Sequence, residues 1–158
     1  MDTRDFRNCL GSFATGVTVV TCKTDIGTRG FTANSFTSVS LDPPLILVSV
    51  DRKIKACSYM KDNSFAVNIL RGDQEKVALH FAGRPQEQLD LQWEEGEFAP
   101  YLANSLATIE CVPWRAYDGG DHVLYLGEVK NYWYVEGDAL GFYKGKFFTV
   151  PSLKSTSE

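Results

Sequence analysis

The sequence predicts a mainly β protein, an antiparallel barrel with a few short helices at its periphery. Three observations support this class. Segments rich in β-branched and aromatic residues recur along the chain, short turn signals separate them, and segments with helical spacing are few and brief. Successive strands joined by tight turns pair antiparallel, and closing such a sheet into a barrel removes its edges.

The N-terminal part of the chain predicts one short helix followed by a β-hairpin. Apolar residues recur at helical spacing behind Asp2 and Thr3, which can cap a helix that ends near Gly11 or Gly16. Residues 17–21 are almost all β-branched, which is typical of a strand. A turn signal then leads into a second strand at residues 28–35.

The middle of the chain alternates strands with two more short helices. Residues 45–50 are apolar on both faces and predict a central strand that is buried on both sides. A helix that ends near Asn63 precedes another strand at residues 65–70. Asp73 can cap the next helix, whose apolar residues lie one turn apart.

The last part of the chain predicts an irregular segment and then more strands. Residues 83–100 are rich in Glu, Gln, Gly and Pro, and so long a loop is often functional. Further strands are predicted at residues 106–115, 122–135, 139–143 and 147–150, which brings the count to seven or eight. Since no linker divides the chain, we expect one domain over residues 1–158, with a disordered tail at residues 155–158.

The bulk composition is that of a folded protein without affinity for polyanions. The chain has 158 residues, of which 44% are hydrophobic and 13% aromatic, and its formal net charge is -4. It can form one well-packed domain, and we expect no nucleic acid and no membrane as partners. The N-terminus has no apolar leader and no apolar run reaches the ~20 residues that span a bilayer, so we expect a cytoplasmic protein.

Cysteines and histidines do not predict a metal site. The four cysteines form no C-x-x-C pair, and in a cytoplasmic protein we expect them to be reduced and buried. A redox role for one of them stays open. Because there are only two histidines, His80 and His122, we expect no bound metal.

Residues 30–44 are too polar for a core strand and too apolar for a solvated loop. Small hydroxyl and amide side chains alternate there with Phe31, Phe36, Val39 and Leu41. Such a segment can pack against a core while it hydrogen-bonds a flat polar ligand. The alternative is a Ser/Thr-rich strand and turn whose side chains satisfy neighbouring backbone groups.

Three further segments have side chains suited to an anionic or aromatic ligand. Residues 51–55 place three cations where a strand is expected to enter a helix, whose N-terminus favours an anion. Glycines 119 and 120 deliver His122 at a strand end, where Asp121 can fix its tautomer. Residues 141–148 predict a hairpin with aromatic faces and two lysines. The alternatives are a solvated basic turn, a structural histidine and a plain hairpin.

Several common enzyme signatures are missing from the sequence. No G-x-G-x-x-G follows a strand and no G-x-x-x-x-G-K-[ST] occurs, so a Rossmann or P-loop site is not supported. Residues 11–16 lack the G-x-S-x-G nucleophile elbow, and nothing points to a Ser-His-Asp hydrolase.

Taken in order, these motifs resemble the flavin reductase family with the FMN-binding split-barrel fold. The matching pieces cover nearly the whole chain, at residues 13–21, 30–44, 65–70, 120–122 and 142–145. Proteins of this family are the small reductase components of two-component flavin-dependent monooxygenases. The resemblance implies an antiparallel Greek-key split β-barrel and, by analogy at the level of the fold, a homodimer.

The resemblance also implies two ligand sites. The flavin would contact Thr32, Ala33, Asn34, Ser35, Phe36, Ser38, Val39, Ser40, Lys53, Lys55, His80 and Phe81. The two lysines would meet its phosphate, while Ile54 stands where family members often have a serine. The nicotinamide nucleotide would contact His122, Phe142, Tyr143, Lys144 and Gly145. His122 would position the nicotinamide and would not act as a nucleophile.

The implied activity is that of an NAD(P)H:flavin oxidoreductase. A hydride would pass from C4 of the dihydronicotinamide of NADH, or of NADPH, to N5 of FMN or FAD. The reduced flavin would then diffuse to a separate monooxygenase. The sequence leaves open the choice of flavin and of nicotinamide, the identity of the oxygenase and whether the flavin stays bound. Two alternatives remain, an electron-transfer protein that holds FMN tightly and a flavin-binding module without catalysis.

Overall fold

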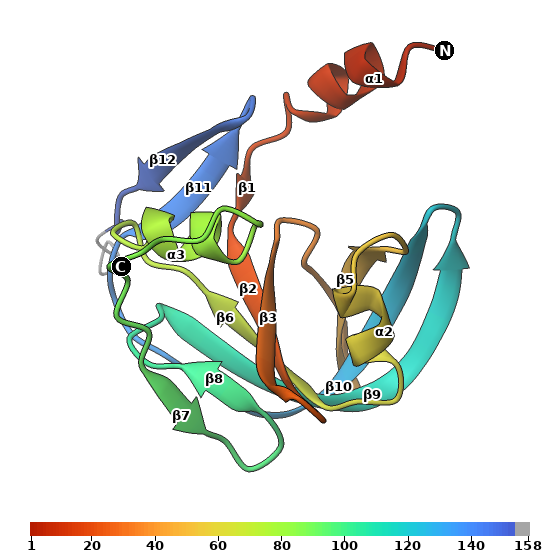
Figure 1. The fold of residues 1–158 in the computed structure, drawn as a ribbon, viewed down its shortest axis with the longest axis vertical. Coiled ribbons are helices and arrows are strands. Elements are labelled where there is room, and N and C mark those ends of the chain that lie inside the picture. The colour runs from red at the N-terminus through yellow and green to blue at the C-terminus, as the bar shows by residue number, and fades with distance from the viewer. Residues whose placement is uncertain (154–158) are drawn as a thin grey trace, which may run out of the picture.

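The fold is an antiparallel β-barrel, seen in a computed structural model that describes residues 1–153 (Figure 1). Its helices are α1 (Thr3–Leu10), α2 (Ala56–Met60) and α3 (Glu75–His80). Its strands are β1 (Thr15–Gly16), β2 (Thr18–Thr24), β3 (Gly27–Ala33), β4 (Thr37–Leu41), β5 (Pro44–Asp51), β6 (Phe65–Ile69), β7 (Trp93–Glu95), β8 (Pro100–Leu102), β9 (Ala107–Gly119), β10 (His122–Tyr134), β11 (Ala139–Tyr143) and β12 (Lys146–Val150). The tail expected at residues 155–158 lies outside the described residues.

Seven strands form the main sheet, in the order β3-β2-β6-β9-β10-β5-β4. Every neighbouring pair is antiparallel. The edge strands β3 and β4 are consecutive in sequence, and in the described part of the chain they are not hydrogen-bonded to each other. The sheet therefore curls into a barrel with a seam between its two edges, which confirms the predicted antiparallel split barrel.

The described residues contain twelve strands, where the sequence predicted seven or eight. Most of the difference comes from β1, β4, β7 and β8, which have two to five residues each. Such short strands give no clear alternation of apolar and polar residues. The longer strands were predicted to within a few residues of their bounds, because their apolar faces pack into the barrel.

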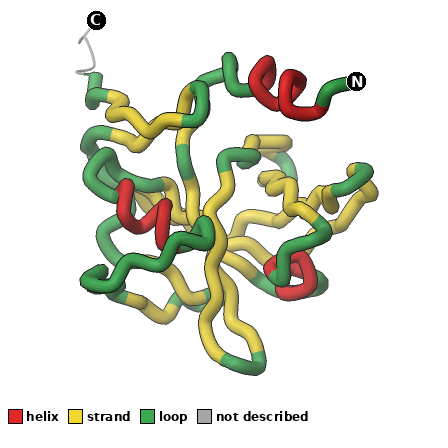
Figure 2. The backbone as a smooth tube through the Cα atoms, turned by 45° about the horizontal axis from the view of Figure 1, so that its top comes forward, coloured by secondary structure: helices red, strands yellow, loops and turns green. Residues whose placement is uncertain are grey.

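The helix α1 stands apart from the barrel (Figures 1 and 2). Asp2 caps it as predicted, since its carboxylate accepts the backbone N–H groups of Arg4 at 2.9 Å and Asp5 at 3.3 Å. No residue of α1 is buried. Just beyond the helix, the backbone N–H of Lys144 donates to the carbonyl of Gly11 at 2.9 Å, which joins this segment to the β11–β12 hairpin.

Two sequence predictions about local structure are wrong. Asp73 does not cap α3; the helix begins after Gln74, whose side-chain oxygen accepts the backbone N–H of Arg71 at 2.7 Å. The strand β5 does pair on both sides, with β10 and with the edge strand β4, but its predicted burial is wrong. It is not buried on both faces, since Leu47 and Ser49 are only half-buried.

The segment 83–100 was expected to be irregular, but it contains β7, which pairs with β8 as a hairpin. A buried polar network attaches this hairpin to the barrel. The Asn68 amide donates to the carbonyl of Val19 at 2.9 Å and accepts the N–H of Leu102 at 3.0 Å. The Thr21 hydroxyl accepts from Asn68 and donates to the carbonyl of Pro100 at 2.6 Å.

A buried carboxylate holds the turn between β7 and β8. Glu110 is 2% exposed, and its Oε2 accepts the N–H of Phe98 at 2.7 Å and the N–H of Ala99 at 3.2 Å. Backbone donors of this kind satisfy a buried charge that would otherwise be costly. The hairpin is therefore held by polar contacts to three buried side chains, those of Thr21, Asn68 and Glu110.

Apolar side chains gather in two clusters. The larger cluster fills the barrel and includes Val20, Val48, Met60, Phe65 and Tyr125. The smaller one lies under α3 and beside β11, and it includes Val17, Val19, Leu70, Ala78, Leu102 and Leu140. Within residues 1–153, no helix is both long enough and apolar enough to span a membrane.

The four cysteines are free but not all buried, which corrects one expectation. Cys9 is exposed and Cys57 is half-buried, whereas Cys22 and Cys111 are buried. Burial raises the pKa of Cys22 to about 11. Burial and the neighbouring Glu110 carboxylate raise the pKa of Cys111 to about 12.

These environments predict an order of thiol reactivity. At pH 8 a disulfide reagent should modify Cys9 first and Cys57 more slowly, while Cys22 and Cys111 react only after unfolding, because the thiolate is the reactive form. Mass spectrometry of the labelled chain before and after addition of denaturant measures this order. Rapid labelling of Cys111 in the folded protein would contradict it.

Candidate active site

The polar segment predicted to contact a ligand spans the seam of the barrel. Thr32 and Ala33 end β3, and residues 34–36 form the loop to β4. The Thr32 hydroxyl donates to the carbonyl of Ala78 at 2.6 Å, which ties α3 to β3. The Ser35 hydroxyl donates to the carbonyl of Ser49 at 2.8 Å and accepts its N–H at 3.2 Å. Both hydroxyls thus bond to the backbone, as the alternative interpretation expected, but to residues far away in sequence and not within a turn.

Asn34 lies between these two anchored residues and differs from both. Its side chain is exposed and makes no hydrogen bond to the rest of residues 1–153. An amide carries both a donor and an acceptor, and here both remain available. Asn34 is therefore the residue of this loop best suited to bind a polar ligand edge.

Three adjoining hollows run along one side of the molecule from α2 to α1, and we call them together the basic groove. The Lys55 hollow, of about 650 Å³, lies between β3, α2 and the C-terminal end of α3. The Arg84 hollow, of about 350 Å³, shares Thr32 and Ala82 with it. The Lys144 hollow, of about 860 Å³, lies beside α1 and shares Asn34, Phe142 and Gly145 with the Arg84 hollow.

The charge of the basic groove is of one sign. Among residues 1–153, no Asp or Glu lines it, while five basic side chains do: Arg7, Arg29, Lys55, Arg84 and Lys144. The whole chain, in contrast, has 20 acidic and 16 basic residues. Because a cleft with charges of one sign concentrates ions of the opposite sign, the groove should attract an anion.

Apolar and aromatic side chains supply the rest of the lining. Phe81 lines the Lys55 hollow, and its ring packs edge-on against His80 and Trp93 with centroid separations of 5.1 and 6.0 Å. Phe142 lines the other two hollows and packs against Phe147 at 5.2 Å. A ligand in the groove would thus meet ring faces and edges as well as cations.

An anchored helix and a hairpin turn position Lys55 and Lys144 at the two ends of the groove. Lys55 immediately precedes α2, which Tyr125 anchors by donating its phenol proton to the carbonyl of Cys57 at 2.7 Å. Lys144 and Gly145 form the β11–β12 turn with φ of 48° and 77°. Glycine adopts such angles without strain, which favours Gly145 at this turn.

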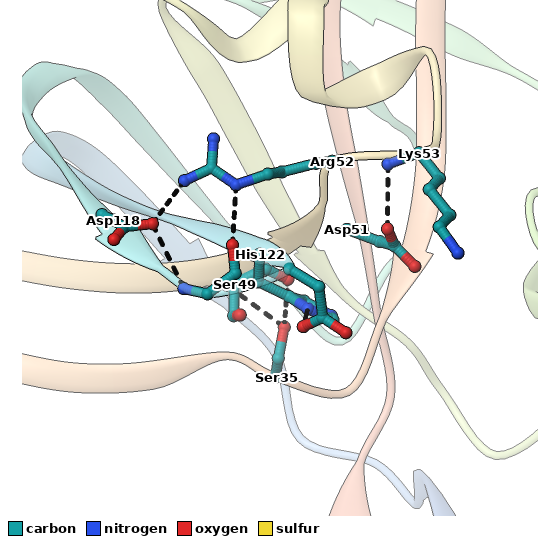
Figure 3. Close-up of polar contacts among 9 residues, drawn as sticks. Ser35, Ser49, Asp51, Arg52, Lys53, Asp118 and His122 are labelled. Atoms are coloured by element: carbon teal, nitrogen blue, oxygen red, sulfur yellow. Dashed lines mark hydrogen bonds and ion pairs between the residues drawn. The ribbon is translucent and has the colours of Figure 1, made fainter. Parts of the chain in front are cut away.

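A second group of polar residues lies around the N-terminal end of β10 (Figure 3). We call it the His122 cluster; it comprises Ser35, Ser49, Asp51, Arg52, Lys53, Asp118 and His122. His122 is paired with Asp51 of β5, and its Nδ1 lies 2.7 Å from the carboxylate of Asp121. This hydrogen bond, together with the charge of His122, holds the pKa of the Asp121 carboxyl below its usual value. The sequence predicted this contact between Asp121 and His122.

The predicted site residues therefore divide between two neighbouring regions. Those that line the basic groove are Thr32, Asn34, Lys55, Phe81, Phe142, Lys144 and Gly145. Ser35, Lys53 and His122 belong to the His122 cluster instead. The two regions adjoin along the chain at residues 34–35 and at residues 53–55.

The remaining predicted residues lie at the margins of these regions. Ser38, Val39 and Ser40 are on the edge strand β4, where Val39 is exposed. His80 accepts the N–H of Gln86 on its Nδ1 at 3.1 Å, which fixes its ring. Ala33 is buried, Phe36 packs against the core, and the exposed ring of Tyr143 lies 5.6 Å from the ammonium of Lys144.

Sequence reasoning missed three basic residues of the groove. Arg7 is one of several polar residues of α1, Arg29 lies in the strand β3, and Arg84 belongs to the segment predicted to be irregular. No motif joins them, so only the fold shows that they face one groove. Arg29 could have been found from the sequence. Side chains alternate along a strand, so Arg29 shares one face of β3 with Phe31, two residues further on.

Comparison with known proteins gives a consistent result. The model of the flavin reductase like domain matches residues 10–151. An NADH-dependent flavin reductase of a Rhodococcus species is 42% identical over 153 residues, which are 93% of this chain and 86% of the relative. The reductase component of a flavin-dependent trigonelline monooxygenase from Acinetobacter baylyi is 42% identical over 158 residues. That alignment covers 97% of this chain and 50% of the longer relative.

A solved structure shows the same fold. The NADH:FAD oxidoreductase of Streptomyces globisporus, determined in complex with NAD and FAD fragments, superposes with a TM-score of 0.86. The two sequences are 41% identical, and the match covers 93% of this chain and 92% of that one.

Proposed function

The chain belongs to the flavin reductase like domain family, and from that membership we propose that it is an NAD(P)H-dependent flavin reductase. The observation that carries the proposal is the basic groove. It combines aromatic side chains, an available amide at Asn34 and five cations, without a lining acid in the part of the chain that the structure describes. FMN, FAD and NADH share the matching chemistry, since each joins a flat heterocycle to phosphate.

The donor set of the groove fits a flavin. The volume of about 650 Å³ in the Lys55 hollow lies within the range of small-molecule sites. Thr32, Asn34 and Phe81 would hold the isoalloxazine, and Lys55 with Arg29 would bind phosphate. The other predicted flavin contacts lie in the adjoining elements, at Ala33, Ser35, Phe36, Ser38, Val39, Ser40, Lys53 and His80. Their role in binding stays a prediction.

The nicotinamide nucleotide would lie on the other side of the 34–36 loop. His122 would position it from the end of β10, and Phe142, Tyr143, Lys144 and Gly145 would contact it from the β11–β12 hairpin. When bound, the flavin supplies the chemistry, accepting a hydride at N5 from C4 of the dihydronicotinamide. The protein stacks, orients and shields the two rings, and no side chain has to act as a nucleophile.

The partners follow from the same membership. We propose that the reduced flavin diffuses to a separate monooxygenase. The Acinetobacter relative is named as the reductase component of a flavin-dependent monooxygenase. We also propose that the protein is cytoplasmic and that it forms a homodimer. The dimer is supported by β4, which presents the exposed side chains of Val39 and Leu41 at an edge of the sheet that the described residues leave unpaired. Sedimentation at micromolar concentration tests the dimer, and a monomer there would contradict it.

The function is tested by mixing purified protein with NADH or NADPH and with FMN or FAD. We expect the nicotinamide absorbance to fall, with free flavin turned over many times. If the absorbance stays constant with every combination of nicotinamide and flavin, the protein is not a reductase. Flavin that survives dialysis without turnover of added flavin would instead indicate an FMN-holding electron carrier. Unchanged NADH kinetics in both His122→Ala and Tyr143→Ala would contradict the nicotinamide site.

A further inference from the structure

Arg52 makes more polar contacts than its exposed position suggests. It lies in the loop that follows β5, and its side chain extends toward the turn between β9 and β10 (Figure 3). Its Nε donates to the carbonyl of Gly120 at 2.8 Å, and its Nη2 donates to the carboxylate of Asp118 at 2.6 Å. Its backbone N–H also donates to the carbonyl of Asp121 at 3.0 Å. One residue thus contacts three of the four residues that precede His122.

Asp118 completes this arrangement from the end of β9. The same oxygen that receives the Arg52 guanidinium also accepts the N–H of Gly120 at 3.2 Å. Gly120 has a φ of 75°, a conformation that glycine adopts without strain. The turn is therefore fixed at its backbone and at one side chain, and His122 follows directly from it as the first residue of β10.

The loop that carries Arg52 also carries the lysines. Lys53 extends in the opposite direction from Arg52 (Figure 3), and its N–H donates to the carboxylate of Asp51 at 2.9 Å. Lys55 lies two residues further on and lines the basic groove. Arg52 consequently joins the segment proposed to bind flavin phosphate to the turn that presents His122.

We propose that Arg52 is a positioning residue for the nicotinamide site, acting by holding the 118–121 turn so that His122 faces the second substrate. Arg52 itself touches neither substrate. The inference rests on the proposed function, because it assigns the effect to NADH. The planar guanidinium matters here, since its fork donates to a carbonyl and a carboxylate at once, which the ammonium of lysine cannot do in the same geometry.

The contact itself is tested without catalysis. In Arg52→Ala, the Gly120 amide should exchange with solvent faster, as measured by NMR, because Asp118 loses the guanidinium that holds its carboxylate in place. Arg71→Ala is the matched control. Arg71 also forms an exposed ion pair, with Asp73, and the side-chain exposures are 44% and 74% there against 47% and 82% for Arg52 and Asp118. Unchanged exchange at Gly120 in Arg52→Ala would overturn the proposal.

The functional consequence is tested by steady-state kinetics on the same variants. Arg52→Ala should raise the KM for NADH about five-fold, as expected for loss of one partly exposed charged contact, with the KM for flavin unchanged. Arg52→Lys should restore little, Asp118→Asn should fall between wild type and Arg52→Ala, and Arg71→Ala should match wild type. Equal changes in both KM values, or none, would overturn the positioning role.

A wild-type protein that oxidises neither NADH nor NADPH would refute the proposed function, which is a separate failure. Binding of NADH to the flavin-free protein, followed by its fluorescence, would then replace the KM. Weaker binding in Arg52→Ala than in Arg71→Ala would still support the role of Arg52, and equal binding would overturn it.

Discussion

Replacing Asn68 by leucine should lower the free energy of unfolding by about 3 kcal/mol or more. Asn68 is 0% exposed, and its amide serves the Val19 carbonyl, the Thr21 hydroxyl and the Leu102 N–H. Leucine has the same branched skeleton but is larger and apolar, and it leaves these buried groups without their partner. A buried donor or acceptor left unpaired costs about 1–3 kcal/mol. Urea unfolding with an unchanged m-value measures the loss.

Asn131→Leu is the control for this prediction. The Asn131 amide donates to the carboxylate of Glu97 at 3.2 Å, and that contact is exposed. Its loss should change stability by less than about 0.5 kcal/mol, because water replaces the protein partner. If the two variants unfold at the same urea concentration, the buried network does not hold the β7–β8 hairpin as described.

Reversing the charge of Lys55 should weaken flavin binding by about 10- to 100-fold. The glutamate in Lys55→Glu would be the first acid to line the Lys55 hollow as residues 1–153 form it, and it would repel the phosphate that the lysine is proposed to bind. The dissociation constant can be measured by quenching of flavin fluorescence, and the KM for flavin should rise in parallel. The KM for NADH should change much less.

Lys61→Glu provides the matched charge reversal. Lys61 is exposed at the C-terminal end of α2 and does not line the Lys55 hollow. It changes the net charge of the protein by the same amount, so it isolates the effect of position from that of total charge. Equal losses of flavin affinity in the two variants would show that Lys55 is not at the phosphate site.

The sequence was sufficient for the class of fold and for the motifs, because both depend on local patterns. Alternating apolar residues located the long strands, whereas the ligand wall around Asn34 stays a prediction. The seam of the barrel could not be predicted in this way, since it depends on pairings such as that of β5 with β10. These strands lie far apart in sequence.

The roles of individual polar residues were the hardest to predict. Thr32, Asn34 and Ser35 look alike in the sequence, yet two of them bond to α3 and β5 while Asn34 remains exposed. Composition cannot show which side chain the fold occupies. The same holds for Asn68 and Glu110, whose burial follows from packing of the β7–β8 hairpin against the barrel.

The three residues that join β3 to β4 are the direct covalent connection across the gap in the barrel wall. A molecule seated on Asn34 would lie over this junction and contact structure on both sides of it. Ligand binding should then oppose separation of the edge strands β3 and β4. The barrel should therefore resist opening more strongly when the ligand is bound. Such a reductase would be most open to proteolysis in the interval between releasing one flavin and binding the next.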